Sequence, residues 1–291
     1  MTCQGLLVVA NTTGIGIWRK RRGAGAGSIH PVPVVSRLSI APVKGLALEH
    51  RDEIELTEHG VREDRRFFLV DDTGRLIDGL LAGRMVQVAA HSDADGSHLR
   101  MTFPDGEVIE DDVRVREPVI TRMYGRTVLG HVVDGPWAEG LEPFAGRRLH
   151  LIRTNSPGGT REKHPATLIT DGSLDLLGQH LGGGPVDGRR FRMLIELEGG
   201  TAHEEDTWIG HRIELGETRM LISKPVARCA ITTQDPDTGA RDLDTLRTII
   251  SYRGLRDGEN VDFGVYGEVE RPGRIRLGDS VRVLDAVEQT A

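Results

Sequence analysis

Short runs of hydrophobic residues, separated by turn-forming residues, make up most of this chain from Val34 onward. Phe67-Phe68-Leu69-Val70 is followed by the turn Asp71-Asp72-Thr73-Gly74 and then by Leu76-Ile77, an order that predicts a β-hairpin. Two further apolar runs, at 85–88 and 99–103, are bounded by turn residues. Strands that recur at this interval predict an antiparallel barrel or sandwich over residues 34–116.

Helical patterns join the strands beyond Pro118. Ser173 is placed to cap a helix over 174–181, whose leucines share one face. Asp244 is placed to cap a second helix that reaches Tyr252. The last stretch, 274–284, predicts two strands joined by a Gly-Asp turn.

These patterns predict a mainly β fold with some helix (α+β) and two domains. A β-barrel-like domain is expected at 34–116, and a second β-barrel-type domain with a few helices at 117–288. Residues 1–33 lack this patterning, and we expect a disordered leader or a misassigned start there. Gly23-Ala24-Gly25-Ala26-Gly27-Ser28 within it has the composition of a flexible linker.

Composition narrows the class of protein. The chain has 291 residues, of which 38% are hydrophobic and 28% charged, as in soluble globular proteins. No apolar run approaches the ~20 residues that cross a bilayer, and two cysteines cannot build a disulfide framework, so we expect a cytoplasmic protein without a transmembrane segment. The net charge is −7, and subtracting the four basic residues of 1–28 leaves −11 on the rest, which argues against nucleic acid as a partner.

Cys229 is the most informative single residue. The only other cysteine, Cys3, lies far away in the leader. Cys229 follows an apolar run at 220–222 and precedes the turn Asp235-Pro236-Asp237-Thr238-Gly239, so it is expected at the end of an element, where sites tend to be built. A free cysteine is often only a small buried hydrophobe, and that alternative stands beside metal ligation and nucleophilic chemistry.

Several common site motifs are missing from the sequence. It contains no His-Glu-x-x-His, no Cys-x-x-Cys, no Gly-x-Gly-x-x-Gly opening a helix and no Walker loop. His203 lies in an acidic segment that is typical of a solvated face. A thiol and histidine pair for nucleophilic catalysis stays open, because such partners meet in space and not in sequence.

Basic residues stand at turns and strand boundaries of this acidic protein. Taken singly, each is expected to be solvated or to form an ordinary ion pair. Together they have the chemistry to hold an anionic cofactor, because guanidinium groups bind phosphate in a bidentate manner. The set is Lys44, Arg65, Arg66, Arg192 and Arg228.

Residues 35–285 resemble the MOSC family (molybdenum cofactor sulfurase C-terminal domain) preceded by the family's N-terminal β-barrel, as in amidoxime-reducing proteins. The most specific part is the run from Arg228 to Gly239, followed by Ser251-Tyr252-Arg253. Supporting pieces occur in the family's order: Pro42-Val43-Lys44-Gly45, Asp64-Arg65-Arg66-Phe67, Phe191-Arg192 and Glu205-Asp206-Thr207-Trp208.

The resemblance implies a molybdenum cofactor, Mo-molybdopterin, bound by this chain. Cys229 would be the thiolate ligand to the metal, and soft thiolate suits such a metal. Arg228 would favour the ionised sulfur, and Tyr252 would lie near the metal as a second catalytic residue. The resemblance places the other cofactor-binding residues at Lys44, Arg66 or its neighbour Arg65, Lys163, His164, Arg192, Thr232 and Asp235. Pyridoxal phosphate binding is a further description attached to the family.

One segment departs from the family pattern. Amidoxime-reducing relatives carry an Asp-Thr-Ser-Pro-like segment that helps to bind the phosphate, whereas this chain has Glu162-Lys163-His164-Pro165. Lys163 and His164 would then serve the same anion with charge in place of hydroxyls, or substrate access would differ.

The resemblance further implies a molybdenum-dependent oxidoreductase that removes oxygen from small N-hydroxylated or N-oxygenated molecules. Electrons would come from a separate ferredoxin-, flavin- or cytochrome-type reductase, because an iron–sulfur cluster needs about four cysteines. The alternatives are a non-catalytic cofactor-binding, sulfur-carrier or delivery protein, and a thiol hydrolase or plain binding module.

Overall fold

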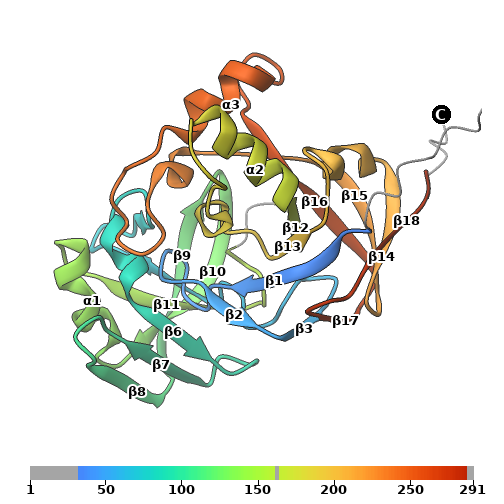
Figure 1. Cartoon of the computed structure of the whole chain (residues 1–291). Helices are drawn as coiled ribbons and strands as arrows, with labels where there is room; N and C mark the ends of the chain where they lie inside the picture. The colour runs from blue at the N-terminus through green and yellow to red at the C-terminus, as the bar shows by residue number, and fades with distance from the viewer. Residues whose placement is uncertain (1–31, 161–163, 287–291) are drawn as a thin grey trace, which may run out of the picture.

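The computed structural model describes residues 32–160 and 164–286, and within them the fold is mainly β with some helix, as expected (Figure 1). The expected leader, residues 1–33, lies almost entirely outside this described part. Lys163 also lies outside it. In the described residues, no helix combines the length and the apolar character needed to cross a membrane.

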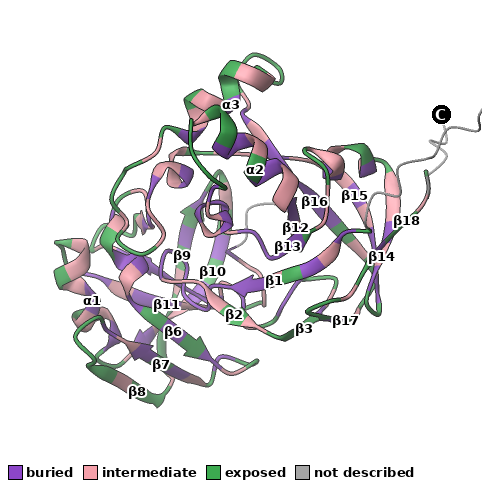
Figure 2. Cartoon of the chain, in the orientation of Figure 1, coloured by how far each residue is buried: buried purple, intermediate pink, exposed green. Residues whose placement is uncertain are grey.

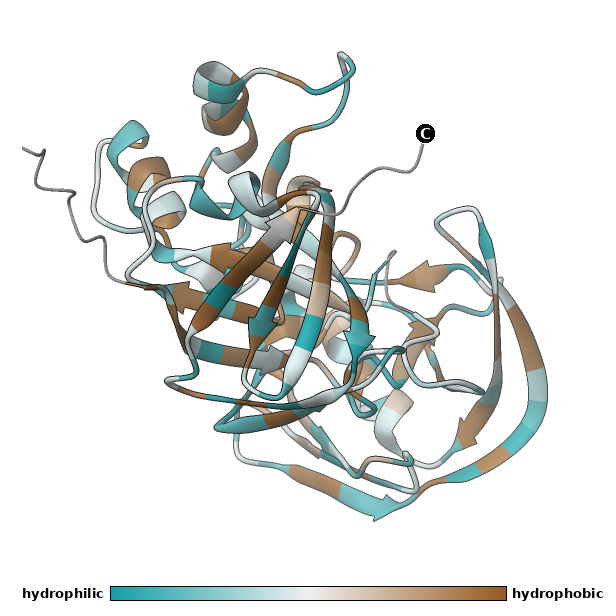
Figure 3. Ribbon diagram, turned by 90° about the vertical axis from the view of Figure 1, so that its right-hand side faces the viewer, coloured by the Kyte–Doolittle hydropathy of each residue, from teal (hydrophilic) through white to brown (hydrophobic). Residues whose placement is uncertain are grey.

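The largest sheet has eight strands and draws on both ends of the described chain. All of its strand pairs are antiparallel except β12 with β13, which is parallel. Hydrophilic and hydrophobic residues alternate along several of its strands (Figure 3), so one face can pack against the core. In sheet order the strands are β18 (Val281–Ala286), β14 (His211–Leu215), β15 (Thr218–Ala227), β16 (Asp262–Arg271), β12 (Ala166–Thr170), β13 (Ile195–Glu198), β1 (Val34–Ile40) and β2 (Glu49–Arg51).

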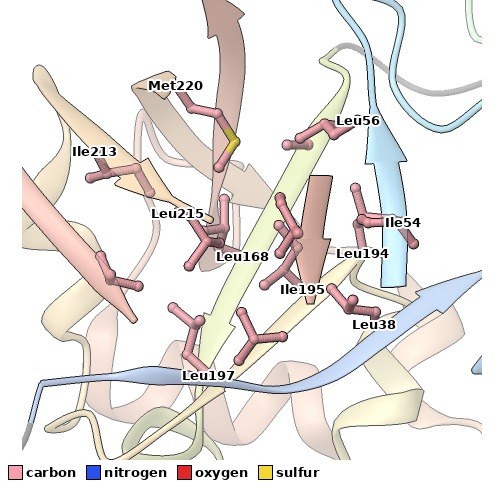
Figure 4. Close-up of a cluster of buried hydrophobic side chains, with 14 of the residues drawn as sticks. Leu38, Ile54, Leu56, Leu168, Leu194, Ile195, Leu197, Ile213, Leu215 and Met220 are labelled. Carbon is pink, nitrogen blue, oxygen red and sulfur yellow. The ribbon is translucent and has the colours of Figure 1, made fainter. Parts of the chain in front are cut away.

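The main hydrophobic core lies against this sheet. Leu38 of β1, Leu168 of β12 and Ile195 of β13 are fully buried in it, together with Met220 of β15 (Figure 4). A two-stranded sheet, β3 (Glu53–Leu56) with β17 (Gly273–Arg276), adds further buried side chains. The core therefore joins strands from the beginning and the end of the chain, and buried segments run through the centre of the molecule (Figure 2).

A second, five-stranded sheet has the order β5 (Leu76–Ile77), β4 (Phe67–Val70), β11 (His150–Thr154), β10 (Arg126–Asp134) and β9 (Arg114–Met123). Strand β4 is buried on both faces, because Phe67 and Leu69 enter one hydrophobic cluster and Phe68 and Val70 another. Helix α1 (Trp137–Ala145) packs beside it, and Trp137 Nε1 donates to the carbonyl of Leu99, 3.2 Å away. Leu99 belongs to a three-stranded sheet, β6 (Ala89–Ser92), β7 (His98–Thr102) and β8 (Val108–Asp112).

Helix α2 (Asp171–His180) packs on β12 and β13 of the large sheet and contacts α3 (Thr245–Arg253) (Figure 1). The described residues also form the short 3-10 helices η1 (Gly83–Gln87), which packs against α1, η2 (Gly188–Phe191), η3 (Glu204–Trp208) and η4 (Ala230–Thr233). Asp244 caps α3 as expected, with Oδ1 accepting from the Arg247 amide. The start of α2 was wrong by a few residues: Thr170 is its N-cap and Ser173 lies inside it, where its hydroxyl donates to Glu205.

One strand expectation is corrected and two are confirmed. The run 85–88 is not a strand but mostly the 3-10 helix η1, whose Met85 and Val86 are both buried as consecutive residues of a helix can be. A Cβ at Gly83 would lie 2.5 Å from the Gly239 carbonyl, so a close contact with a distant loop fixes this bend. The hairpin at 67–77 is confirmed. The last two strands, joined through Gly278-Asp279, are confirmed as well, and they pair with β3 and β14.

The expected domain boundary at residue 116 falls inside β9. Strands β1 and β2, which precede it, belong to the eight-stranded sheet, while β10 and β11, which follow it, belong to the sheet of β4 and β5. The two halves of the sequence are therefore interleaved in space.

Candidate functional site

Cys229 lies two residues beyond the end of β15, at the N-cap of η4, so its expected position at an element end is confirmed. Its thiol is exposed, which excludes the alternative of a buried packing cysteine. The backbone turns here because the Cys229 carbonyl accepts from the Thr232 amide at 3.3 Å and from the Thr232 hydroxyl at 3.2 Å. The exposed sulfur therefore stands on a hydrogen-bonded turn.

Thr232 and Asp235 stabilise this turn through hydrogen bonds. Thr232 is fully buried, and its Oγ1 lies 2.8 Å from the hydroxyl of Thr245 at the start of α3. Asp235 Oδ1 accepts from the Thr238 hydroxyl and from the amides of Asp237 and Thr238, and the hydroxyl contact is the main cause that lowers the pKa of Asp235. The contacts of both residues shape the loop, and direct contact with a cofactor stays a prediction.

The Arg228 guanidinium joins the end of β15 to the segment that carries Arg192. Its Nη2 donates to the Phe191 carbonyl, its Nη1 lies 3.3 Å from Met193 Sδ, and its Cζ lies 5.2 Å from the centre of the Phe191 ring. Arg228 therefore positions the residues on either side of Arg192.

Three cations, Lys44, Arg65 and Arg192, come together from distant parts of the sequence. Arg65 Nη2 donates to the Arg192 carbonyl at 3.2 Å, and the Arg65 carbonyl accepts from the Thr160 hydroxyl at 2.6 Å. Lys44 is buried, with Nζ 3.4 Å from the Thr160 carbonyl. We call these three residues the cation cluster. The clustering expected from the sequence is thus found for three of the five basic residues.

The two consecutive arginines diverge because Arg65 has a φ of 54°. Arg65 turns toward the cation cluster, whereas Arg66 Nη2 donates to the Asp95 carbonyl at 3.1 Å. Burial lowers the pKa of Arg66, and neighbouring Arg153 lowers it further. Of the two alternatives left open by the sequence, Arg65 is the one that lies beside Arg192.

Charges of both signs surround the cation cluster, and Arg65 Nη1 pairs with Asp64 Oδ2 at 2.5 Å. Loss of hydration lowers the pKa of Arg192 to about 10, and the nearby Arg65 acts in the same direction. Asp64 and Asp78 oppose this effect and offset it only in part. A like charge beside a poorly hydrated guanidinium disfavours its charged form, so an added anion would relieve the repulsion.

The segment Asp78-Gly79 joins the cation cluster to the turn of Cys229. A Cβ at Gly45, next to Lys44, would lie 3.2 Å from the Gly79 nitrogen, and a Cβ at Gly79 would lie 2.6 Å from Ile231 Cδ1. Gln234 Nε2 also donates to the Gly79 carbonyl at 2.8 Å. Because glycine allows this close approach, the loops that carry Lys44 and Cys229 pack around one short segment.

His164 has partners on β16. Its Nδ1 lies 3.3 Å from Glu268 Oε1, and its ring lies 5.1 Å from that of Tyr266. Lys163, the other residue of the departing segment, lies outside the described residues. A role for either in anion binding stays a prediction.

Tyr252 belongs to a polar group that sequence reasoning missed. Its hydroxyl lies 3.3 Å from His203 Nε2, and its ring stacks on His180 at 4.2 Å. Burial raises the pKa of Tyr252 to about 12 and lowers that of His203 to about 4. The expectation that His203 lies on a solvated face was wrong, because its ring packs against Tyr252 and also against Phe263.

A buried carboxyl lies behind His203. Glu205 is completely buried and accepts from the hydroxyls of Thr170 at 2.6 Å and Ser173 at 2.8 Å. Burial raises the pKa of Glu205 to about 7. The Ser173 hydroxyl also accepts from the His203 amide at 2.9 Å, which links α2 to η3. The spacing of these residues in the sequence does not predict their contact, because they meet only through tertiary packing.

Comparison with known families defines the class. A profile described as "MOSC domain" matches residues 154–282, and one described as "MOSC N-terminal beta barrel domain" matches residues 32–129. Together they span most of the chain, and the chain belongs to the MOSC domain family. The family resemblance inferred from the sequence is confirmed.

Curated relatives cover nearly the whole chain. Mitochondrial amidoxime-reducing component 1 of Mus musculus is 25% identical, covering 96% of this chain and 90% of its own. Mitochondrial amidoxime reducing component 2 of Homo sapiens is 27% identical, with 95% and 90% covered. The match to the solved YUAD protein from Bacillus subtilis covers 87% of this chain and 96% of that protein, at 11% identity and a TM-score of 0.42.

The donor set fits a molybdenum pterin cofactor. An exposed thiol at Cys229 is available as a soft ligand for the metal. The guanidinium groups of the cation cluster have the chemistry to bind a phosphate. The loop of Lys44 and the turn of Cys229 both pack on Gly79, so this chain offers a thiol and a cation on neighbouring loops.

Proposed function

We propose that this protein binds a molybdenum pterin cofactor and reduces small N-hydroxylated molecules of the amidoxime or hydroxylamine type. The observation that carries the proposal is the exposed thiol of Cys229 on a turn that shares a packing partner, Gly79, with the loop of Lys44. The names of the relatives support the substrate class, since those proteins are called amidoxime-reducing components.

In this proposal Cys229 Sγ holds the metal, while Lys44, Arg65 and Arg192 hold the anionic part of the cofactor. The bound cofactor would supply a two-electron reduction in which the substrate loses its oxygen. The net change is R–NHOH + 2e⁻ + 2H⁺ → R–NH₂ + H₂O, so each turnover consumes two electrons and two protons.

Tyr252 keeps its proton throughout the neutral pH range, because its pKa is raised to about 12. Its hydroxyl can therefore act as a hydrogen-bond donor toward a polar group of the substrate, and its contact with His203 fixes the direction of the ring. We propose the phenol as a donor and not as a base.

The electrons would come from a separate protein of the ferredoxin, flavin or cytochrome type, because the two cysteines of the chain are too few for an iron–sulfur cluster. Cytoplasmic location is part of the same proposal, although the curated relatives are named mitochondrial. Cell fractionation of the native source tests it.

Molybdenum content tests the binding proposal. The wild-type protein, made in a host that synthesises the cofactor, is expected to purify with close to one molybdenum per chain. Cys229→Ser should lose most of it, because a hydroxyl is a harder and poorer ligand than a thiolate. Cys3→Ser is the matched control and should retain the metal. Equal metal content in both variants would remove Cys229 from the site.

Reduction of benzamidoxime with an artificial electron donor tests the reaction. Cofactor-loaded wild type is expected to form benzamidine. A second function, sulfur or cofactor delivery, is favoured by the exposure of the same thiol, which would be accessible as a persulfide. A loaded protein without reductase activity, or a molybdenum-free protein with a persulfide on Cys229, would favour delivery.

A further inference from the structure

A hollow of ≈ 470 Å³ lies between the turn that joins β4 to β5 and the end of the β9–β10 hairpin. Its volume falls within the ~300–1,000 Å³ that is usual for small-molecule sites. It is lined by Thr73, Gly74, Arg75, Leu76, Asp78, Leu80, Leu81, Arg122, Met123 and Tyr124.

Tyr124 separates the hollow from the cation cluster. It has a φ of 50° at the tip of the β9–β10 hairpin, which turns its ring over Lys44, with Nζ 5.1 Å from the ring centre. Its hydroxyl donates to Asp78 Oδ2 at 2.9 Å. Lys44 and the hollow therefore share one aromatic wall.

One short segment, Asp78 to Leu81, lies between the hollow and the turn of Cys229. Asp78, Leu80 and Leu81 line it, and Gly79 between them packs on Ile231, two residues after Cys229. A molecule whose reacting end lies at the thiol could extend its other end across the 78–81 segment into this space.

The lining combines an apolar floor with free positive charge. Leu76, Leu80 and the exposed Leu81 supply hydrophobic surface. Arg75 and Arg122 are exposed, and their guanidinium groups make no hydrogen bond or ion pair with any described residue. The single acidic residue of the lining, Asp78, is engaged by Tyr124.

From this combination we infer that the hollow binds the tail of the substrate, and that the preferred tail is an apolar group that ends in a carboxylate or another anion. The inference rests on the proposed function for the reaction itself, but the binding preference follows from the hollow alone. Arg75 and Arg122 would contact the anion from the rim, because arginine side chains match carboxylate geometry. The apolar part would cover the leucines.

A matched pair of substrates tests the inference. 4-Carboxybenzamidoxime and 4-carbamoylbenzamidoxime have nearly the same shape and differ in charge. Loaded wild type is expected to show a KM about three- to tenfold lower for the carboxylate, a modest ratio because both arginines are exposed. The double variant Arg75→Ala/Arg122→Ala should bring the ratio close to one and leave kcat unchanged. Arg114→Ala, an exposed arginine of the same strand β9 outside the hollow, should keep the wild-type ratio.

Equilibrium binding of the two compounds, measured by calorimetry without an electron donor, gives a second readout that does not need turnover. The preference for the carboxylate should be lost in the double variant, and in wild type it should weaken between 50 mM and 500 mM salt. Equal binding of both compounds by wild type, or a preference that survives the double substitution, would overturn the inference.

The outcomes separate this inference from the proposed function. If loaded wild type reduces neither compound, the proposed function fails and the calorimetric arm decides the inference alone. If the double variant slows only turnover that is driven by a donor protein, with substrate binding unchanged, the arginines serve that donor and the inference is wrong.

Discussion

At the scale of single residues, Arg65 and Arg66 are chemically identical neighbours with different surroundings. The left-handed conformation of Arg65 sends one guanidinium to Arg192 and the other to the carbonyl of Asp95. Sequence comparison alone cannot separate such a pair, because a shift of one position gives an equally good match.

Substitution of the pair separates their roles. Arg65→Ala is expected to speed loss of the molybdenum cofactor at least about tenfold, because a charge-assisted contact contributes roughly 1.5–3 kcal/mol. Arg66→Ala should leave the rate of loss near that of wild type. The measurement is molybdenum retained by each variant after timed dialysis. A faster loss from Arg66→Ala than from Arg65→Ala would contradict the assignment.

Glu205 makes stability depend on pH. Its pKa is raised from 4.5 to about 7 in the folded protein by burial, so the folded state holds a proton that the unfolded chain has already released. Stability contributed by this group is therefore lost as the pH rises from about 4.5 to 7. Glu205→Gln should cancel the loss and stabilise the protein above pH 7 by up to about 3 kcal/mol.

The test is the difference in unfolding free energy between Glu205→Gln and wild type, measured in urea at several pH values. The difference should be small near pH 4.5 and reach its full size above pH 7. Glu198→Gln, at the exposed end of β13, is the control and should show no such trend. Because His203 with its pKa lowered to about 4 acts in the opposite direction in both proteins, its effect cancels in the difference.

Sequence reasoning found part of the site and missed another part for a physical reason. Cys229 stands out because it is isolated, and Lys44 and Arg192 stand out as cations at turns, so composition and spacing identify them. Glu205 and Ser173 are common residue types, 32 positions apart, that meet only when α2 packs against η3. Their chemistry comes from burial, which no local pattern reports.

At the scale of elements, sequence patterns predicted a helix or hairpin correctly where the contacts that form it lie within the element itself. The hairpin at 67–77 is set by its own turn, and α3 by the cap at Asp244, and both were predicted. The run 85–88 has a strand-like composition, yet contact with the loop at Gly239 bends it into η1. The strands that pair with β17 and β18 also could not be predicted, because pairing between residues far apart in the sequence produces no pattern in a short stretch of sequence.

The cap of α3 gives a prediction at this scale. Asp244→Ala removes the side-chain acceptor for the Arg247 amide and should lower the unfolding free energy by about 1 kcal/mol. Asp244→Asn keeps an acceptor and should stay within a few tenths of wild type. Urea unfolding followed by circular dichroism measures both. Equal losses in the two variants would show that the carboxylate charge, and not the cap, is what matters.

At the scale of the whole molecule, the interleaved sheets predict that the two halves do not fold separately. A fragment of residues 117–288 lacks β1 and β2 from the edge of the large sheet, and it lacks β3, the partner of β17. It would expose Ile275 and the buried face of β13, so we expect an aggregated or unfolded fragment. The measurement is the dispersion of amide signals in its NMR spectrum compared with that of residues 32–288.

A fragment with well-dispersed signals and a cooperative unfolding transition would contradict this expectation and would support an independent domain at 117–288. Adding a peptide of residues 32–58 provides a control. If the missing strands are what the fragment lacks, the peptide should restore order by occupying the open edge next to β13.

The pairing of β1 with β13 also sets a time scale for synthesis. Ser36 and its partner Glu196 lie 160 positions apart. At ~5–20 residues per second, the ribosome needs roughly ten to thirty seconds to deliver the second strand after the first has been made. During that interval the apolar strand Val34–Ile40 has no native neighbour on the β13 side, so a nascent chain of this protein is expected to need protection by a chaperone that binds extended hydrophobic segments.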